Sequence, residues 1–209
     1  MNVIKMVETT SWQKLTGDDY IKAVNAVNAV LSKDIFSIKS SVMQTKQLSF
    51  YKNFKMLQAT ELNAYPRCVI NFLYNGQDVV KLDYSANPIA RVNQTSPLEL
   101  DASNLGDYLK FFFASIRGKN NEAFYLVEKL SDVPLKLDAD EEIEQSITKA
   151  VSPFKTSQKD ADNFNIDAFI VHQNNLYDAQ INVSLDGTVT IMQETIVMSD
   201  LPIQKNMLK

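Results

Sequence analysis

The chain has 209 residues, 45% of them hydrophobic, and a formal net charge of −4, which is the composition of a folded globular protein rather than a disordered one. Lysines are scattered along the sequence and arginine occurs only at Arg67, Arg91 and Arg117, so no segment concentrates the positive charge that a nucleic-acid-binding surface needs. The length is sufficient for one large domain or two small ones.

The sequence carries no pattern of export or membrane insertion. Residues 1–10 lack the continuous apolar stretch of a signal peptide, and no segment reaches the roughly 18 apolar residues of a membrane span. The single cysteine, Cys68, cannot form an internal disulfide bond, which favours a reducing compartment. We therefore expect a cytoplasmic protein that binds neither nucleic acid nor membrane.

Apolar residues recur at helical spacing from about Gly17 to Leu31, which predicts an amphipathic helix. Thr16 and Asp18 are suited to cap its N-terminus. Its buried face would consist of Tyr20, Val24, Val27 and Leu31. The following segment, Ile35 to Leu62, indicates one or two strands whose layout the sequence leaves open.

An Asn-Gly pair, Asn75-Gly76, between two apolar runs predicts a β-hairpin. A three-residue loop that starts at Tyr74, with Gly76 in the left-handed conformation, would bring the apolar residues of both strands to one face of the sheet. That face would consist of Cys68, Ile70, Phe72, Val80, Leu82 and Tyr84.

A central helix is predicted from about Asn104 to Arg117, capped by Ser103 or Asp101 and followed by Gly118. Its apolar positions extend beyond one stripe, so we expect it to be covered on more than one side. They are Leu105, Tyr108, Leu109, Phe111, Phe112, Phe113 and Ile116. A strand from about Ala123 to Leu130 and a third helix from about Ala139 to Val151 follow.

A second meander is predicted from about Ile166 to Met192, after a polar linker or surface loop from Lys155 to Asn165. Three-residue loops at 173–175 and at 185–187 would connect its strands. The second loop would pair Val183 with Val189 and Ile181 with Ile191. The core face would consist of Phe169, Val171, Tyr177, Ala179, Ile181, Val183, Val189 and Ile191.

Together these elements predict an α+β fold in which about three α-helices pack on antiparallel β-meander sheets. The predicted units are residues 1–135, with the first meander and the central helix, and residues 136–209, with the third helix and the second meander. Because each half combines a helix with a meander, the sequence also allows two similar halves or one compact domain.

No catalytic or cofactor motif is recognisable. The single histidine cannot form a two-histidine zinc motif, and the acidic triplets 138–140 and 160–162 have Ile143 and Asn165 where a calcium loop needs glycine. None of the five glycines forms a phosphate-binding loop. We therefore expect no cofactor and no metal, and a non-catalytic role is favoured over an enzymatic one.

Two sets of residues are candidate binding sites. The first is a polar set on or beside the first meander, suited to carboxylate or phosphate ligands because it contains two arginines. This set consists of Arg67, Asn71, Asp83, Tyr84 and Arg91. The second is an outer face of the C-terminal meander where His172 lies beside Ile170 and Leu176, which would suit a protein partner.

The leading functional hypothesis is a binding or chaperone-like protein that holds another polypeptide, or a second copy of itself in a homodimer, through a sheet edge or an apolar face. The order helix, three strands, helix, strand, together with the acidic charge, is similar to that of small bacterial cytosolic chaperones that hold secretion substrates. The alternative is a small-molecule-binding protein or an enzyme with a pocket lined by arginine and carboxylate.

Overall fold

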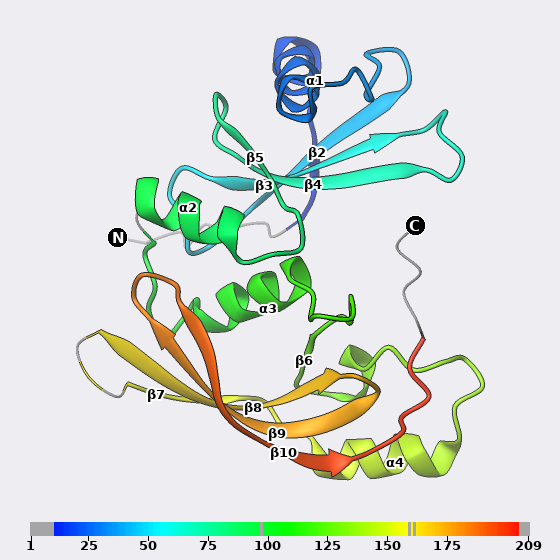
Figure 1. The fold of residues 1–209 in the computed structure, drawn as a ribbon, viewed down its shortest axis with the longest axis vertical. Coiled ribbons are helices and arrows are strands. Elements are labelled where there is room, and N and C mark those ends of the chain that lie inside the picture. The colour runs from blue at the N-terminus through cyan, green and yellow to red at the C-terminus, as the bar shows by residue number, and fades with distance from the viewer. Residues whose placement is uncertain (1–10, 97, 159, 161, 205–209) are drawn as a thin grey trace, which may run out of the picture. The chain divides into compact units, whose positions relative to one another are not determined.

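The computed structural model describes residues 11–96, 98–158, 160 and 162–204. These residues form four α-helices and two antiparallel sheets of five strands each, which confirms the predicted α+β class (Figure 1). Contacts within the chain divide it into unit 1 (Met1–Leu82) and unit 2 (Asp83–Lys209), whereas the sequence predicts a boundary at residue 135. No helix in the described ranges is long and apolar enough to cross a membrane. The expectation about residues 1–10 lies outside the described residues.

Unit 1 consists of one helix and one antiparallel sheet, in which neighbours in sequence are neighbours in space. The helix, α1 (Gly17–Leu31), has the predicted ends. The strands are β1 (Gln13–Lys14), β2 (Ser41–Gln47), β3 (Lys55–Glu61), β4 (Cys68–Tyr74) and β5 (Val79–Lys81). Strands β2 and β3 therefore account for the segment whose layout the sequence leaves open.

Local chemistry fixes both ends of α1. Thr16 occupies the N-cap position through its backbone carbonyl, without a capping bond from its side chain, and Asp18 and Asp19 suit the positive end of the helix dipole. Ser32 adopts the left-handed conformation, with φ of 53°, so that its N–H reaches the carbonyl of Ala29. The core between α1 and the sheet consists of Ala23, Val24, Val27, Phe36, Met43, Leu57, Ala59, Phe72 and Tyr74.

The register predicted for the β4–β5 hairpin is wrong. Phe72 pairs with Lys81 and Leu73 pairs with Val80, so Phe72 and Val80 lie on opposite faces of the sheet. Both Leu73 and Val80 are nevertheless buried, because this sheet has buried apolar residues on both faces. A rule that assigns all apolar residues to one face therefore selects the wrong pairing here.

The hairpin loop has four residues, Asn75 to Asp78, rather than three. The side-chain oxygen of Asn75 accepts hydrogen bonds from the N–H groups of Gln77, at 2.9 Å, and Asp78, at 2.7 Å. These bonds stabilise a longer loop, and the residue opposite Phe72 is Lys81 instead of the predicted Asp78, a shift of three residues. Gly76 does adopt the predicted left-handed conformation, with φ of 99°.

Unit 2 contains the remaining helices and a second antiparallel sheet of order β10-β9-β8-β6, with β7 also paired to β8. Its helices are α2 (Asn87–Thr95), α3 (Leu105–Ser115) and α4 (Glu141–Ala150), with a short 3₁₀ turn at Leu130–Asp132. Its strands are β6 (Tyr125–Val127), β7 (Lys155–Gln158), β8 (Asn163–His172), β9 (Asn175–Ser184) and β10 (Val189–Met198). Helix α2 is not predicted from the sequence. Strand β7 and the start of β8 occupy the segment Lys155 to Asn165, which the sequence predicts as a linker or surface loop.

Helix α3 is buried around most of its circumference, which confirms the expectation that it is covered on more than one side. Tyr108 and Phe111 are buried together with Leu109 and Phe113. The carboxylate of Asp101 accepts hydrogen bonds from N–H groups just before the first turn, so it satisfies donors that the helix itself leaves free. The phenol of Tyr108 donates a hydrogen bond to the turn between β9 and β10.

The predicted register of β9 and β10 is confirmed, because Val183 pairs with Val189 and Ile181 pairs with Ile191. The three-residue loop between them contains Gly187 in the left-handed conformation, with φ of 84°.

The register predicted for β8 and β9 is wrong by one residue. His172 pairs with Asn175 across a two-residue turn, Gln173-Asn174, in which both residues have positive φ, 49° and 63°. Such a turn matches the twist of a hairpin but ordinarily recruits glycine at one position, and no glycine is present here. As a consequence Phe169 and Val171 lie on the face opposite to that predicted.

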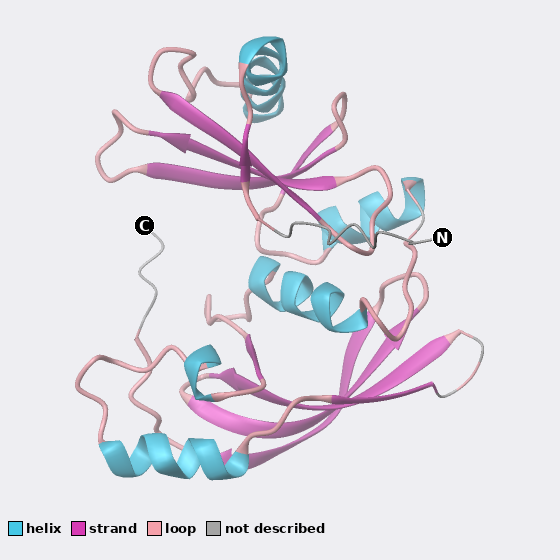
Figure 2. Cartoon of the chain, turned by 180° about the vertical axis from the view of Figure 1, so that it is seen from behind, coloured by secondary structure: helices cyan, strands magenta, loops and turns pink. Residues whose placement is uncertain are grey.

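Both faces of the second sheet are covered, with α3 on one side and α4 on the other (Figure 1, Figure 2). Ile170 is completely buried and His172 is 8% exposed on the face toward α3, where Phe124 links the His172 ring to Phe113. Leu176 lies on the opposite face, in one core with Ile147 of α4. The predicted partner surface of His172, Ile170 and Leu176 is therefore corrected, since these residues are buried and do not share a face.

Candidate functional site

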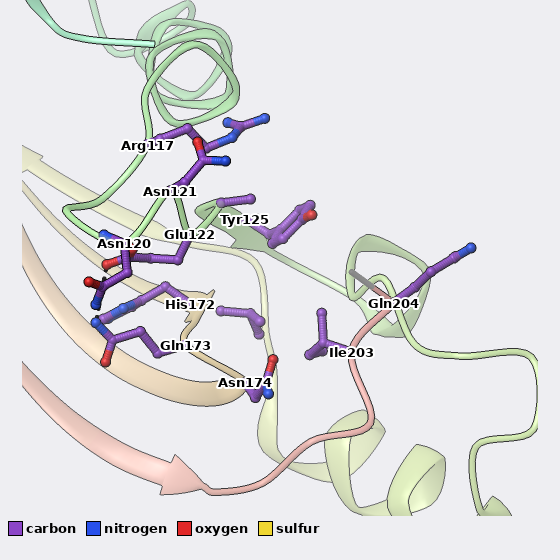
Figure 3. Close-up of a pocket in the computed structure, with 12 residues that line it drawn as sticks. Arg117, Asn120, Asn121, Glu122, Tyr125, His172, Gln173, Asn174, Ile203 and Gln204 are labelled. Atoms are coloured by element: carbon purple, nitrogen blue, oxygen red, sulfur yellow. Dashed lines mark hydrogen bonds between the residues drawn. The ribbon is translucent and has the colours of Figure 1, made fainter. Parts of the chain in front are cut away.

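A hollow of about 290 Å³ lies in unit 2 where three segments meet (Figure 3). The segments are the loop between α3 and β6, the β8–β9 turn, and the chain at Ile203 and Gln204. We call it the β8–β9 hollow. Its lining consists of Arg117, Asn120, Asn121, Glu122, Ala123, Tyr125, Val171, His172, Gln173, Asn174, Ile203 and Gln204.

Backbone hydrogen bonds order the segments around the hollow. The loop closes through a bond from the Gly118 N–H to the carbonyl of Glu122, at 2.9 Å. The N–H of Leu201 bonds to the carbonyl of Asn174, at 2.7 Å, and the N–H of Gln204 bonds to Pro134. The walls of the hollow are therefore fixed by main-chain contacts, which favours a preformed site.

The carboxylate of Glu122 is held at the base of the loop. One oxygen accepts a hydrogen bond from the side chain of Gln173, at 3.2 Å, and the other accepts one from the N–H of Asn120, at 2.7 Å. Hydrogen bonds from its own backbone N–H and from Gln173 lower the pKa of Glu122. The group is thus ionised at neutral pH and offers only acceptor atoms to a ligand.

His172 forms part of the inner wall. Its ring stacks on Tyr177 with centroids 4.3 Å apart, and its Nε2 lies 3.2 Å from a carboxylate oxygen of Glu194 on β10. The other ring nitrogen, Nδ1, is buried and has no hydrogen-bond partner among the described residues. A histidine oriented by a carboxylate is the arrangement of a catalytic base, but the lining of the hollow contains no serine, threonine or cysteine on which it could act.

Arg117 connects the hollow to one residue of the predicted polar set. Its guanidinium lies over the ring of Tyr84, 4.7 Å from the ring centre, and donates a hydrogen bond of 2.7 Å to the carbonyl of Ile116. The Arg117 N–H also bonds to the carbonyl of Tyr84, at 2.9 Å. Tyr84 is therefore a neighbour of the hollow and does not line it.

The other residues of the predicted polar set lie in different places. Arg67 and Asn71 belong to unit 1, where Arg67 is exposed and the side chain of Asn71 accepts a hydrogen bond from Gln58. Asp83 and Arg91 belong to unit 2, where Asp83 bonds to Ser85 in a turn and Arg91 lies on the exposed face of α2. None of the predicted five residues lines the β8–β9 hollow.

The outer edge of β10 is a second candidate site. It is ten residues long, whereas the other strands at the margins of the two sheets, β1, β5, β6 and β7, have two to four residues. Within the described ranges, no segment pairs with this edge. Met192, Ile196 and Val197 on it are 64%, 56% and 40% exposed. The pairing with β9 is irregular at Met192 and at Val197, where β-bulges interrupt it.

Sequence reasoning missed the residues of the hollow because they come from segments far apart in the chain. The pairs Asn120-Asn121 and Gln173-Asn174 do indicate turns, since such residues tolerate positive φ. Nothing in their spacing predicts that the two turns meet. The partnership of His172 with Glu194 depends on the corrected register of the sheet.

Comparisons with protein-family models, with curated proteins and with solved structures found no match to this chain.

Proposed function

We propose that this protein binds an extended segment of another polypeptide, which adds as a further strand along β10. The observation that carries the proposal is the ten-residue outer edge of β10, a length found at no other sheet margin of the described residues. Unpaired backbone groups of an edge strand form hydrogen bonds with an added strand, and this is a recurring mode of peptide recognition.

The side chains of β10 support this use. Glu194 is its single charged residue, and the strand contains neither lysine nor proline, the residues that usually protect an edge from pairing. Valine, isoleucine and threonine make up most of the rest, and they favour the extended conformation. Because Met192 and Ile196 are exposed, a partner with apolar residues at alternate positions would cover surface that now faces water.

Two contacts hold β10 ready for a partner. At its middle, Glu194 is 3.2 Å from the ring nitrogen of His172, which is itself buried. At its start, the turn that leads into it is fixed by the hydrogen bond from Tyr108 to Gly187. An edge that is already extended and fixed loses less conformational entropy on binding than a flexible one.

A selection of displayed peptides of the same length as β10, with the full chain as bait, tests the proposal. We expect selected peptides with apolar residues at alternate positions. Their binding should fall at least about tenfold, or ~1.4 kcal/mol, in Met192→Lys and Ile196→Lys, because each change places a charge and a hydrated amine on the edge.

Leu137→Lys is the matched control, since Leu137 is an exposed apolar residue that lies outside the sheet. It should bind the selected peptides as the unmodified chain does. Amide hydrogen exchange provides a second measurement, because an added strand protects the outward N–H groups of β10. Equal losses in all three variants, or no added protection on β10, would refute the proposal.

The expected homodimer is one form of the same pairing, with a second copy of β10 as the added strand. Light scattering distinguishes it from binding to a different polypeptide. A concentration-dependent dimer that Ile196→Lys dissociates would identify the chain itself as the partner. A strict monomer that also binds no hydrophobic dye would argue against any apolar docking surface.

A further inference from the structure

Five of the twelve residues that line the β8–β9 hollow carry side-chain amides. Asn120, Asn121 and Asn174 line it, and none of their side chains forms a hydrogen bond with any residue that the structure describes. Figure 3 shows them on the two loops that border the hollow. Each side-chain amide has two hydrogen-bond donors on its nitrogen and an acceptor on its oxygen. Together the three amides suit a ligand with several groups that both donate and accept hydrogen bonds.

The charges of the lining are balanced. Arg117 and Glu122 contribute one positive and one negative charge, with His172 counted as neutral. The guanidinium of Arg117 is already engaged with the carbonyl of Ile116 and the ring of Tyr84, and the carboxylate of Glu122 with Gln173. Because the one positive and the one negative charge of the lining cancel, a strongly charged ligand gains little net electrostatic attraction there.

One part of the wall is apolar. Ala123, Tyr125, Val171 and Ile203 contribute carbon surface, so the hollow combines an apolar side with a rim of amides. Its volume of about 290 Å³ lies at the lower end of ligand sites, which commonly measure roughly 300–1,000 Å³. The site accordingly suits a ligand of one small ring with a C–H face and a hydroxylated edge.

We propose that the β8–β9 hollow binds a small, neutral, polyhydroxylated molecule such as a single sugar ring or a cyclic polyol. The amides of Asn120, Asn121 and Asn174 form its hydrogen bonds, the carboxylate of Glu122 accepts from one hydroxyl, and the carbon surface beside Tyr125 packs against the ring. This site goes beyond the proposed polypeptide binding and does not depend on it.

The chemistry of the residues favours this ligand over two others. An ionised Glu122 repels a phosphate or a carboxylate and so offsets the attraction of Arg117, and the pKa of Glu122 is lowered by hydrogen bonds that hold the ionised form. Among the described residues, no group of three or more histidine, cysteine or acidic side chains is placed to hold a metal ion. A neutral polyol needs neither a charged side chain to balance it nor a set of metal-binding side chains.

Nuclear magnetic resonance of the ¹⁵N-labelled full chain tests the proposal directly, because side-chain amides give their own signals. D-glucose, N-acetylglucosamine and myo-inositol serve as neutral probes, with glycine and inorganic phosphate as charged ones. At least one neutral probe should shift the side-chain signals of Asn120, Asn121 and Asn174 in a saturable way. No saturable shift with any neutral probe, or a stronger response to glycine or phosphate, would overturn the proposal.

Substitutions sharpen this test. Asn120→Ala should weaken binding of the responding probe about fivefold to tenfold, since one pair of hydrogen bonds is lost. Asn174→Gly should do the same, and glycine accommodates the φ of 63° at this position. Asn53→Ala, an exposed asparagine of unit 1, is the matched control and should bind normally. Equal binding by all three variants would locate the probe elsewhere and refute the site.

Glu122→Gln separates the ligand classes. Glutamine keeps an acceptor at the same place, so a neutral polyol should bind within about threefold of the unmodified affinity. A cationic or zwitterionic ligand would lose its counter-charge and bind far more weakly, which would overturn the assignment. Ile196→Lys should leave polyol binding unchanged, so a failure of the β10 proposal and a failure of this one are distinguishable.

Discussion

The hydroxyl of Tyr108 donates a buried hydrogen bond of 2.6 Å to the carbonyl oxygen of Gly187, 79 residues further along the chain. This contact joins helix α3 to the turn from which β10 starts. The amide of Asn93 also contacts the Tyr108 hydroxyl, at 3.3 Å, and donates to the carbonyl of Asp186, at 3.0 Å. The start of β10 is therefore fixed from α2 and α3 together.

Gly187→Ala is expected to destabilise the fold by about 3 kcal/mol. Its φ of 84° is unfavourable for alanine, and a Cβ there would collide with Asn93 and with the Tyr108 hydroxyl. Gly76→Ala is the matched control, because Gly76 also has positive φ but has open space around its Cβ position. It should cost about 1 kcal/mol. Urea unfolding measures the free energy of unfolding of both variants. Equal losses of stability would show that the structure relieves the collision at Gly187.

Alkaline unfolding should depend on Tyr108. Burial raises the pKa of its phenol to about 12, from 10.0, so the folded protein holds the proton more tightly than the unfolded chain. The resulting stabilisation is fully present below pH 10.0 and is lost as the pH rises toward about 12. Tyr108→Phe should lower stability at neutral pH by about 1–2 kcal/mol and flatten this alkaline decline. If the stability of Tyr108→Phe falls with rising pH as steeply as that of the unmodified chain, other groups cause the alkaline loss of stability.

Acid stability should depend on Glu61 in unit 1. Hydrogen bonds from the hydroxyl of Ser40 and from the N–H groups of Asn63 and Ser37 lower the pKa of Glu61 to about 2. A lowered pKa stabilises the fold above the unfolded value of 4.5, and this contribution is lost as the pH falls from 4.5 toward about 2.

Glu61→Gln should therefore lower stability at neutral pH by about 2 kcal/mol and weaken its dependence on acid. Glu99→Gln, which changes an exposed carboxylate, is the control and should retain the acid profile. Unfolding midpoints in urea across this pH range provide the measurement. Identical profiles for the two variants would contradict the role of Glu61.

Glu194→Ala should loosen the middle of β10, because it removes the group that lies 3.2 Å from the Nε2 of His172. Amide exchange along β10 should accelerate about fivefold, which corresponds to roughly 1 kcal/mol of local stability. Gln193→Ala, at the exposed neighbouring position, is the control. If both variants exchange alike, the histidine does not anchor the strand.

The sequence predicts best where one local pattern decides the structure. Helix α1 has the predicted ends because its apolar spacing and its capping residues agree, and the turn at Gly187 has the predicted register because a glycine occupies its left-handed position. Helix α2 was missed because Pro88 and Asn87 at its start resemble a loop, and its buried face is only three residues, Pro88, Ile89 and Val92.

Prediction fails where side chains act over distance or where both faces of a sheet are buried. The side chain of Asn75 lengthens one hairpin loop, and Gln173 and Asn174 adopt positive φ without a glycine in another. The first effect shifts the pairing by three residues and the second by one, and any odd shift exchanges the faces of a strand. The site residues depend on these registers, so the pairing of His172 with Glu194 and the meeting of two asparagine-containing loops are not predictable from the sequence.

Because α3 and α4 lie on the two faces of the second sheet, another chain reaches its backbone only along the rim. One side of that rim is β10, and the other side is formed by β6 and β7, which are three and four residues long. Short strands offer few hydrogen bonds to an added strand, so addition is confined to the β10 side of this sheet. The stoichiometry of any complex formed there is accordingly one bound segment for each copy of the protein.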